Sequence, residues 1–254
     1  MIGMIELTYR HGIAVMTMVH GKANALDVEF CEALAAQFEA LRGSDAKAVV
    51  LTGQGPMFSA GVDLLRLSAG GADYVRRFLP ALHRLYDTVF FFPKPVVAAV
   101  NGHAIAGGCV LQACADRRIA ARDGGRIGVT ELLVGVPFPP LAFEIMRFAT
   151  PPAFFAETIL SGATYPPETA LGRRMIDELA EPSELLDRAS AAAETLSTLP
   201  PAAFAQTKQQ LRQPVTDAVE RHGRRDEAVA EEIWTAPETL AHIRDYITKT
   251  FKKA

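Results

Sequence analysis

The chain has 254 residues, of which 49% are hydrophobic, and this is enough apolar material for a substantial buried core. Its 26 basic and 29 acidic residues give a formal charge of -3, which excludes the broad basic surface of a nucleic-acid-binding protein. No nucleic-acid partner is therefore expected, and any bound phosphate must be held by a local pocket.

The N-terminal part of the chain begins with a predicted strand–helix–strand sequence. Residues 12–19 (GIAVMTMV) alternate small or polar with larger apolar residues, which predicts a strand. Asp27 is a suitable N-cap for the helix that follows. The buried face of that helix would be formed by Phe30, Leu34, Phe38 and Leu41. Residues 47–53 (KAVVLTG) predict a second, fully buried strand.

The same alternation continues with a strand over residues 95–100 and a helix over 107–115. Strands that are apolar on both faces and alternate with helices are typical of α/β proteins, so the sequence predicts this fold class. Between these units, residues 65–92 begin with the glycine-rich RLSAGGADY, which predicts a mobile loop over a binding site, followed by a helix. We expect most of the apolar residues of this helix to pack in the core and some of them to line an acyl pocket. These residues are Tyr74, Phe78, Leu82 and Leu85.

From Pro182 onward the strand patterns disappear. Residues 183–199, 201–213 and 217–234 predict three helices separated by prolines. We therefore expect an α/β core over residues 1–181 and a helical segment over 182–254. An apolar face for contact with other subunits would be formed by Leu185, Leu196, Phe204, Leu211 and Trp234.

The cysteines and histidines give no sign of a disulfide framework or a metal site. Cys31, Cys109 and Cys114 are odd in number and lack C-x-x-C spacing, so free thiols and a cytoplasmic location are expected. The six histidines lack H-x-x-x-H spacing, and no metal is expected. No signal-peptide pattern is present, and polar residues and glycines interrupt the one long apolar window, 95–115, so no membrane insertion is expected.

Two stretches place small residues between a predicted strand and a helix or turn: 57–64 (MFSAGVDL) and 105–112 (IAGGCVLQ). Small side chains let a ligand approach the backbone, and free N–H groups at a helix start can bind a developing negative charge. Neither stretch matches G-x-G-x-x-G or G-x-S-x-G. A Gly-Gly pair at such a junction more often reflects close packing, so both interpretations stay open on spacing alone.

Four motifs occur in a definite order: NALD at Asn24, FSAGVDL at Phe58, NGHAIAGGC at Asn101 and ELLVGVP at Glu131. In order and approximate separation they resemble the enoyl-CoA hydratase/isomerase (crotonase) superfamily, from the first strand to about Gly172. The resemblance implies a crotonase-like ββα superhelix with a C-terminal helical oligomerisation segment. It also implies an acyl-CoA thioester substrate, no cofactor, and a homotrimer or dimer of trimers.

The resemblance further implies roles for individual residues. The backbone N–H groups of Ala60 and Gly107 would form an oxyanion hole for the thioester oxygen, and Glu131 would be the catalytic acid/base. Lys22 resembles a residue that meets CoA phosphates, although on the residues alone a solvated loop lysine is an equal alternative. The substrate channel would be lined by Ala23, Ala25, Val62, Asp63, Leu64 and Gly108.

Val110 departs from the pattern of the hydratases, which resemble GGGCEL here and keep a second glutamate downstream. This chain keeps only Glu131. Hydration needs a base for the water and an acid for the α-carbon, whereas moving a double bond needs one carboxylate that carries a proton from C2 to C4. The chain therefore resembles the Δ3,Δ2-enoyl-CoA isomerase branch.

Several alternatives stay open. A hydratase, a thioester hydrolase or another CoA thioester enzyme of the superfamily would share the oxyanion hole, and a non-catalytic CoA-binding protein is a further possibility. Glu131 by itself is compatible with an exposed strand end, but the apolar run ELLVGVPFPP predicts a poorly solvated side chain with raised proton affinity. Ala106 replaces a frequent third glycine, which leaves the acyl pocket's shape open. Lys252 and Lys253 would either reach a neighbouring subunit's CoA or fray.

Overall fold

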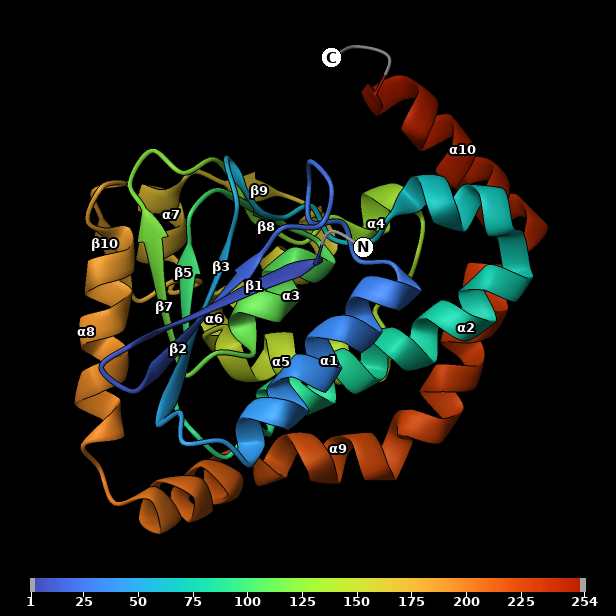
Figure 1. Cartoon of the computed structure of the whole chain (residues 1–254). Coiled ribbons are helices and arrows are strands. Elements are labelled where there is room, and N and C mark those ends of the chain that lie inside the picture. Colours follow the sequence, from blue (N-terminus) through green and yellow to red (C-terminus); the bar gives the residue numbers. More distant parts are fainter. Residues whose placement is uncertain (1–2, 252–254) are drawn as a thin grey trace.

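The structure is a computed structural model that describes residues 3–251 (Figure 1). Lys252 and Lys253, for which a contact with CoA was considered, lie outside the described residues. Within residues 3–251, no helix is both long and apolar enough to cross a membrane.

The larger of two sheets contains the strands predicted from the sequence. Its neighbouring strands are parallel except for the antiparallel pair β1 and β2. The order across it is β1 (Ile5–Arg10), β2 (Ile13–Met18), β3 (Ala48–Gly53), β5 (Val96–Val100), β7 (Arg117–Ala121) and β10 (Glu178–Ala180). Consecutive residues of β3 and β5 are buried on both faces, which explains their continuous apolar sequences. The predicted α/β class is confirmed.

Successive ββα units build much of the N-terminal part. In the units β3–β4–α2, β5–β6–α3 and β7–β8–α4, the first strand joins the larger sheet and the second joins the smaller sheet. The smaller sheet contains β4 (Met57–Ser59), β6 (His103–Ile105), β8 (Ile127–Gly128) and β9 (Thr164–Tyr165). The helices are α2 (Leu64–Phe90), α3 (Gly107–Ala113) and α4 (Glu131–Val134).

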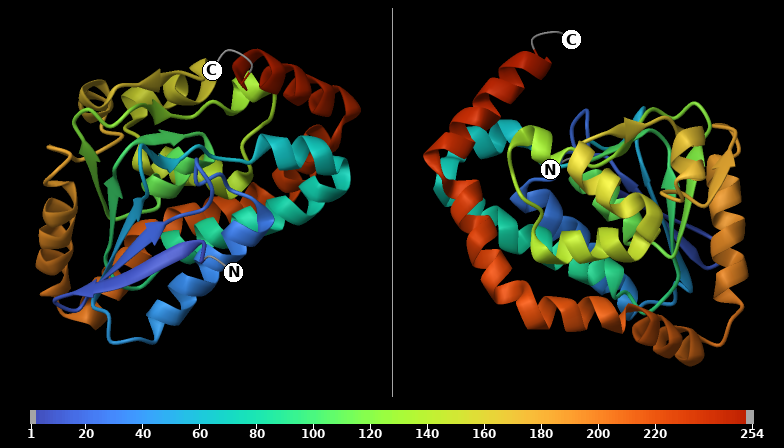
Figure 2. Two further views of the ribbon diagram at one scale, coloured as in Figure 1. Left: turned by 45° about the horizontal axis from the view of Figure 1, so that its top comes forward. Right: turned by 180° about the vertical axis from the view of Figure 1, so that it is seen from behind.

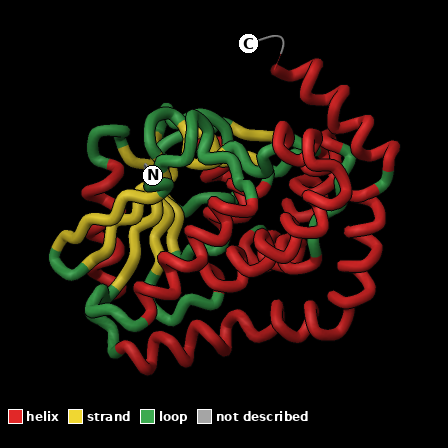
Figure 3. The backbone as a smooth tube through the Cα atoms, turned by 45° about the vertical axis from the view of Figure 1, so that its right-hand side comes forward, coloured by secondary structure: helices red, strands yellow, loops and turns green. Residues whose placement is uncertain are grey.

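Helices cover both faces of the larger sheet, as Figures 2 and 3 show. On one face, α8 (Leu185–Ser197) buries Leu185, Ala189 and Ala193 against the strands. The opposite face carries α1 (Val28–Arg42), α2 and α3. Asp27 caps α1 as predicted, because its Oδ1 accepts the Phe30 N–H at 2.7 Å. The four predicted core positions of α1 are buried.

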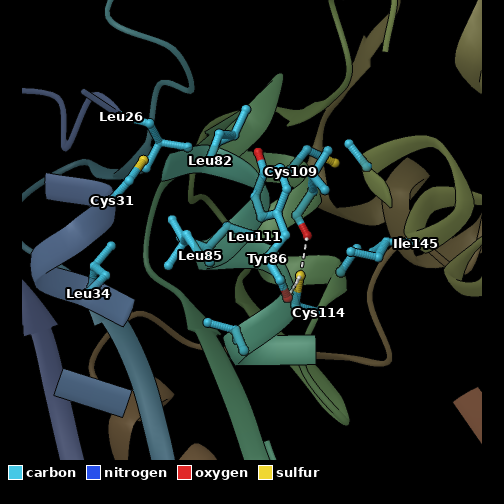
Figure 4. Close-up of a cluster of buried hydrophobic side chains, with 14 of the residues drawn as sticks. Leu26, Cys31, Leu34, Leu82, Leu85, Tyr86, Cys109, Leu111, Cys114 and Ile145 are labelled. Atoms are coloured by element: carbon cyan, nitrogen blue, oxygen red, sulfur yellow. Dashed lines mark hydrogen bonds between the residues drawn. The ribbon is translucent and has the colours of Figure 1, made fainter. Parts of the chain in front are cut away.

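Elements α1, α2 and α3 meet around the fully buried Tyr86 (Figure 4). Leu26, Leu85 and Leu111 are also part of this core. All three cysteines are buried and free, and burial raises the pKa of Cys109 and Cys114 to about 12. These thiols are therefore core groups rather than nucleophiles.

The prediction of a mobile loop at the start of residues 65–92 is wrong. Helix α2 begins at Leu64, where Asp63 caps it by accepting the Arg66 N–H at 3.0 Å. The glycines form a kink instead, since Gly71 has φ 60 and ψ -151 inside the helix. The four apolar residues predicted on this helix are buried in the core, and none of them lines the cavity described below.

The C-terminal helices differ from the prediction in two ways. Residues 201–213 and 217–234 form one helix, α9 (Pro201–Thr235), with Pro214 inside it, and α10 (Pro237–Phe251) follows. In addition, Leu185 and Trp234 are buried within this chain, so they do not form an exposed subunit face. The division at residue 182 stays a prediction. The remaining helices are α5 (Pro140–Ala149), α6 (Pro152–Ser161) and α7 (Pro167–Gly172).

Candidate active site

The site lies where three helices leave the smaller sheet. Strands β4, β6 and β8 are parallel, so their carboxyl ends lie at the same edge of this sheet. Ala60 follows β4, Gly107 begins α3 just after β6, and Glu131 begins α4 just after β8. The three residues that the sequence predicts for chemistry are thus brought to one edge by the repetition of the ββα unit.

A cavity of about 710 Å³ opens at this edge. Seven of the predicted residues line it: Lys22, Ala23, Ala25, Val62, Asp63, Leu64 and Glu131, together with Ala60 of the expected oxyanion hole. Its walls are mostly apolar side chains with a few polar groups, which is the usual character of a small-molecule site. Gly107 and Gly108 do not belong to its lining.

Glu131 is the buried carboxylate of the cavity. Its exposed fraction is 8%, and its Oε2 has no hydrogen-bond partner among residues 3–251. Burial raises the pKa of Glu131 to about 7. The backbone of Glu131 belongs to one helical turn, which ends at Gly135 with φ 86. The Val136 N–H donates to the Glu131 carbonyl at 3.0 Å and closes this turn. The expected burial is found, and the catalytic role remains a prediction.

The two expected oxyanion-hole groups differ in their hydrogen bonding. Within residues 3–251, the Gly107 N–H has no acceptor. The Ala60 N–H, by contrast, donates to the Ala23 carbonyl at 2.9 Å, because residues 23–26 run beside residues 60–63. An oxyanion role for Ala60 therefore requires that a ligand share this N–H with Ala23 or take it over. This engagement was not foreseen from the sequence.

Glycines allow the two junctions to approach each other. Gly61 has φ 80, and a Cβ added there would lie 2.9 Å from the Gly107 nitrogen. Gly108 contacts Ser59 instead of the cavity, because an added Cβ would come 2.3 Å from the Ser59 carbonyl oxygen. The predicted substrate contact of Gly108 is therefore replaced by a packing role. Close packing, one of the two interpretations that the spacing left open, is found at Gly108, and the oxyanion role of Gly107 stays a prediction.

Charged groups gather at the loop that carries Lys22. Lys22 itself is exposed at the cavity, and His20 lines the same part of it. The His20 Nε2 lies 2.7 Å from Oδ2 of the buried Asp27, which also lies 3.2 Å from Arg66. His20 was missed in the sequence because a single histidine in a loop carries no motif. Its partner Asp27 is recognisable only as a helix cap.

The far wall comes from segments that local motifs do not identify. Val134 and Val136 follow Glu131 in the chain, so ELLVGVP contains them without marking them as wall residues. Trp234 of α9 and Tyr246 of α10 lie about a hundred residues further on and line the same cavity. Val110 does not line it: this residue is 1% exposed within the apolar core.

The fold and the cavity define an α/β protein of ββα units with one buried carboxylate at an apolar site. The profile of the enoyl-CoA hydratase/isomerase family matches residues 8–246. A Mycobacterium tuberculosis protein described as the probable enoyl-CoA hydratase EchA17 is 33% identical over 201 residues, which are 78% of this chain and 76% of that protein. The chain therefore belongs to the enoyl-CoA hydratase/isomerase family.

Solved structures agree with this assignment. The apo structure of an enoyl-CoA isomerase from Mycobacterium tuberculosis superimposes with a TM-score of 0.81 at 33% identity, covering 89% of this chain and 98% of that one. Human mitochondrial Δ3-Δ2-enoyl-CoA isomerase gives a TM-score of 0.93 at 21% identity and covers 99% of both chains. The second match shows that the crotonase fold extends through the C-terminal helices.

Proposed function

We propose that this protein moves the double bond of 3-enoyl-CoA thioesters to the 2-position, with Glu131 as the only acid/base. The observation that supports this most directly is the pair of carboxylates at the cavity. Asp63 is engaged as the cap of α2, whereas Glu131 is buried with a free Oε2 and a raised pKa. One available carboxylate suits a reaction in which one proton is removed and returned.

The proposed reaction has two proton transfers. Glu131 takes a proton from C2 of the thioester, and the C–H electrons form a dienolate whose negative charge lies on the thioester oxygen. The Gly107 N–H, which has no acceptor within residues 3–251, stabilises that oxygen, and the Ala60 N–H joins it when the ligand shares or takes over the bond to the Ala23 carbonyl. Protonated Glu131 then returns the proton to C4, which leaves the double bond between C2 and C3. A base with a pKa near neutrality is suited to both transfers.

Hydration of 2-enoyl-CoA is the second candidate, because EchA17 is described as a probable hydratase. Against it stands Val110, an apolar residue at the position where the hydratases that the motif resembles carry a glutamate. Water addition would need a second acid or base, and Asp63, the other carboxylate that lines the cavity within residues 3–251, caps α2.

Rates on two substrates test the proposal. Purified protein is assayed with 3-hexenoyl-CoA for isomerisation and with crotonyl-CoA for hydration under the same conditions. We expect isomerisation to exceed hydration by at least about a hundredfold, the typical contribution of a positioned acid or base. Hydration as fast as isomerisation would contradict the proposal and favour the hydratase.

A further inference from the structure

The cavity has two walls of different origin. One wall consists of the paired loops at residues 20–25 and 60–65, which are joined by the Ala60–Ala23 hydrogen bond and carry the polar groups His20 and Lys22. The other wall is mostly apolar and comes from the segment after Glu131 and from the two C-terminal helices, which also contribute Tyr246 and Thr250. Glu131 and Ala60 line the same cavity as these two groups of residues. This arrangement matches a ligand with a charged carrier, a reactive centre and an apolar tail.

Trp234 of α9 is the largest side chain of the apolar wall. It is the only tryptophan of the sequence, it is 1% exposed, and it lines the cavity beside Val134, Val136 and Tyr246. Because its outer side is shielded from solvent, a chain that reaches the indole cannot continue past it into water.

The indole is fixed in its position. Its Nε1–H donates to the Pro137 carbonyl at 2.9 Å, and its ring centroid lies 6.5 Å from that of Phe78 on α2. Pro137 follows directly after the wall residue Val136, so the same hydrogen bond joins α9 to the segment that carries Glu131. Moving the indole away would break the hydrogen bond to Pro137 and open a cavity beside Phe78.

We infer that Trp234 is the end wall of the acyl compartment and restricts this protein to short- and medium-chain acyl-CoA thioesters. This inference rests on the proposed function, since it takes the acyl group of that substrate as the occupant. Each methylene buried before the chain reaches Trp234 adds to the affinity. Methylenes beyond that point gain nothing, because they must either fold back or displace a fixed ring.

Calorimetric titration with saturated acyl-CoA thioesters measures this limit without turnover, because these ligands have no double bond to move or hydrate. From butyryl- to lauroyl-CoA, we expect the wild-type affinity to rise about fourfold per methylene and then to stop rising. In Trp234→Ala the rise should continue, so that the longer thioesters bind at least about tenfold more tightly than they bind the wild type. Within each protein, butyryl-CoA is the reference to which the affinities of the longer thioesters are compared.

A matched control removes packing from the same helices without changing the cavity wall. Ile243 of α10 is fully buried and does not line the cavity, so Ile243→Ala should leave the chain-length limit unchanged. If circular dichroism shows that Trp234→Ala is unfolded, Trp234→Phe, which keeps a smaller ring, carries the test and should move the limit by about one or two methylenes.

The fluorescence of the single tryptophan gives an independent readout in the unmodified protein. Emission should change on binding of octanoyl-CoA and stay unchanged with CoA alone, because only the acyl chain reaches the indole. An unchanged chain-length limit in a folded Trp234 variant would overturn the inference. So would an equal change of the chain-length limit in Ile243→Ala. Failure of the wild type to bind any acyl-CoA would instead refute the proposed function itself.

Discussion

At the scale of single residues, the burial that suits Glu131 to its proposed catalytic role also costs stability. Its pKa is raised from 4.5 to about 7, so the folded protein holds this proton more tightly than the unfolded chain does. Below the pKa that Glu131 has in the unfolded chain, the carboxyl is protonated in both states and does not destabilise the fold. As the pH rises through the folded pKa, stability is lost, because ionisation is easier in the unfolded chain.

This linkage predicts the effect of Glu131→Gln on folding. Glutamine keeps the shape but cannot ionise, so the variant should be more stable than the wild type above about pH 8, by up to about 3 kcal/mol. Near pH 4 the difference should largely disappear. Urea denaturation at both pH values measures the free energy of unfolding of each protein. A difference between them that does not depend on pH would show that ionisation of Glu131 does not destabilise the fold.

The chemistry of single residues was predictable where the sequence surrounds them with a consistent pattern. The apolar run after Glu131 predicted its burial, and this is what the structure has. Hydrogen bonds between distant segments could not be predicted, and the bond from Ala60 to Ala23 is an example. The backbone conformation of Ala106 could not be predicted either. This residue adopts φ 49 and ψ -124, which favours glycine, although the surrounding sequence gives no sign of strain.

At the scale of elements, the junction of β4 and α3 depends on a glycine at position 108. A Cβ there would lie 2.3 Å from the Ser59 carbonyl oxygen, and backbone cannot move aside as a flexible side chain can. Gly108→Ala should therefore destabilise the protein by about 3 kcal/mol or more. Thermal and urea denaturation measure this loss.

Gly172, at the end of α7, is the matched control, because an added Cβ would meet nothing within 4 Å. Gly172→Ala should change stability by less than about 1 kcal/mol, in the stabilising direction. Equal stability of the two alanine variants would mean that the close approach of α3 to β4 is not required.

The strands and α1 could be predicted because their apolar periods and the Asp27 cap agree with each other. The start of α2 and the continuity of α9 could not. The glycines around Gly71 predict a loop, but one residue at φ 60 is accommodated as a kink between helical segments. Pro214 predicts a helix end, yet a proline within a long helix is tolerated when packing on both sides holds the helix.

At the scale of the whole molecule, the chain leaves large apolar side chains uncovered. Leu211 of α9 is 63% exposed and Leu160 of α6 is 70% exposed. We propose, as the sequence indicated, that the protein assembles as a trimer or a dimer of trimers through such surfaces. Light scattering at micromolar concentration should give the mass of three or six chains, whereas the mass of one chain would contradict this.

The global arrangement of the site could be predicted only through the family resemblance. The motifs at Ala60, Gly107 and Glu131 are far apart in the chain, and the repeated ββα unit brings them to one edge of a sheet. The contribution of Trp234 and Tyr246 to the same cavity was not predictable, because helices of the C-terminal segment reach it by tertiary packing alone.

Proton exchange at C2 of a bound thioester in heavy water tests the role of Glu131 most directly. Exchange followed by nuclear magnetic resonance reports the first proton transfer alone, so it does not depend on the later fate of the dienolate. The wild type should exchange this proton and isomerise 3-hexenoyl-CoA. Glu131→Gln should bind the thioester with unchanged affinity and lose both activities by at least about a hundredfold. Full exchange in a folded Glu131→Gln variant would contradict the assignment of Glu131 as the base.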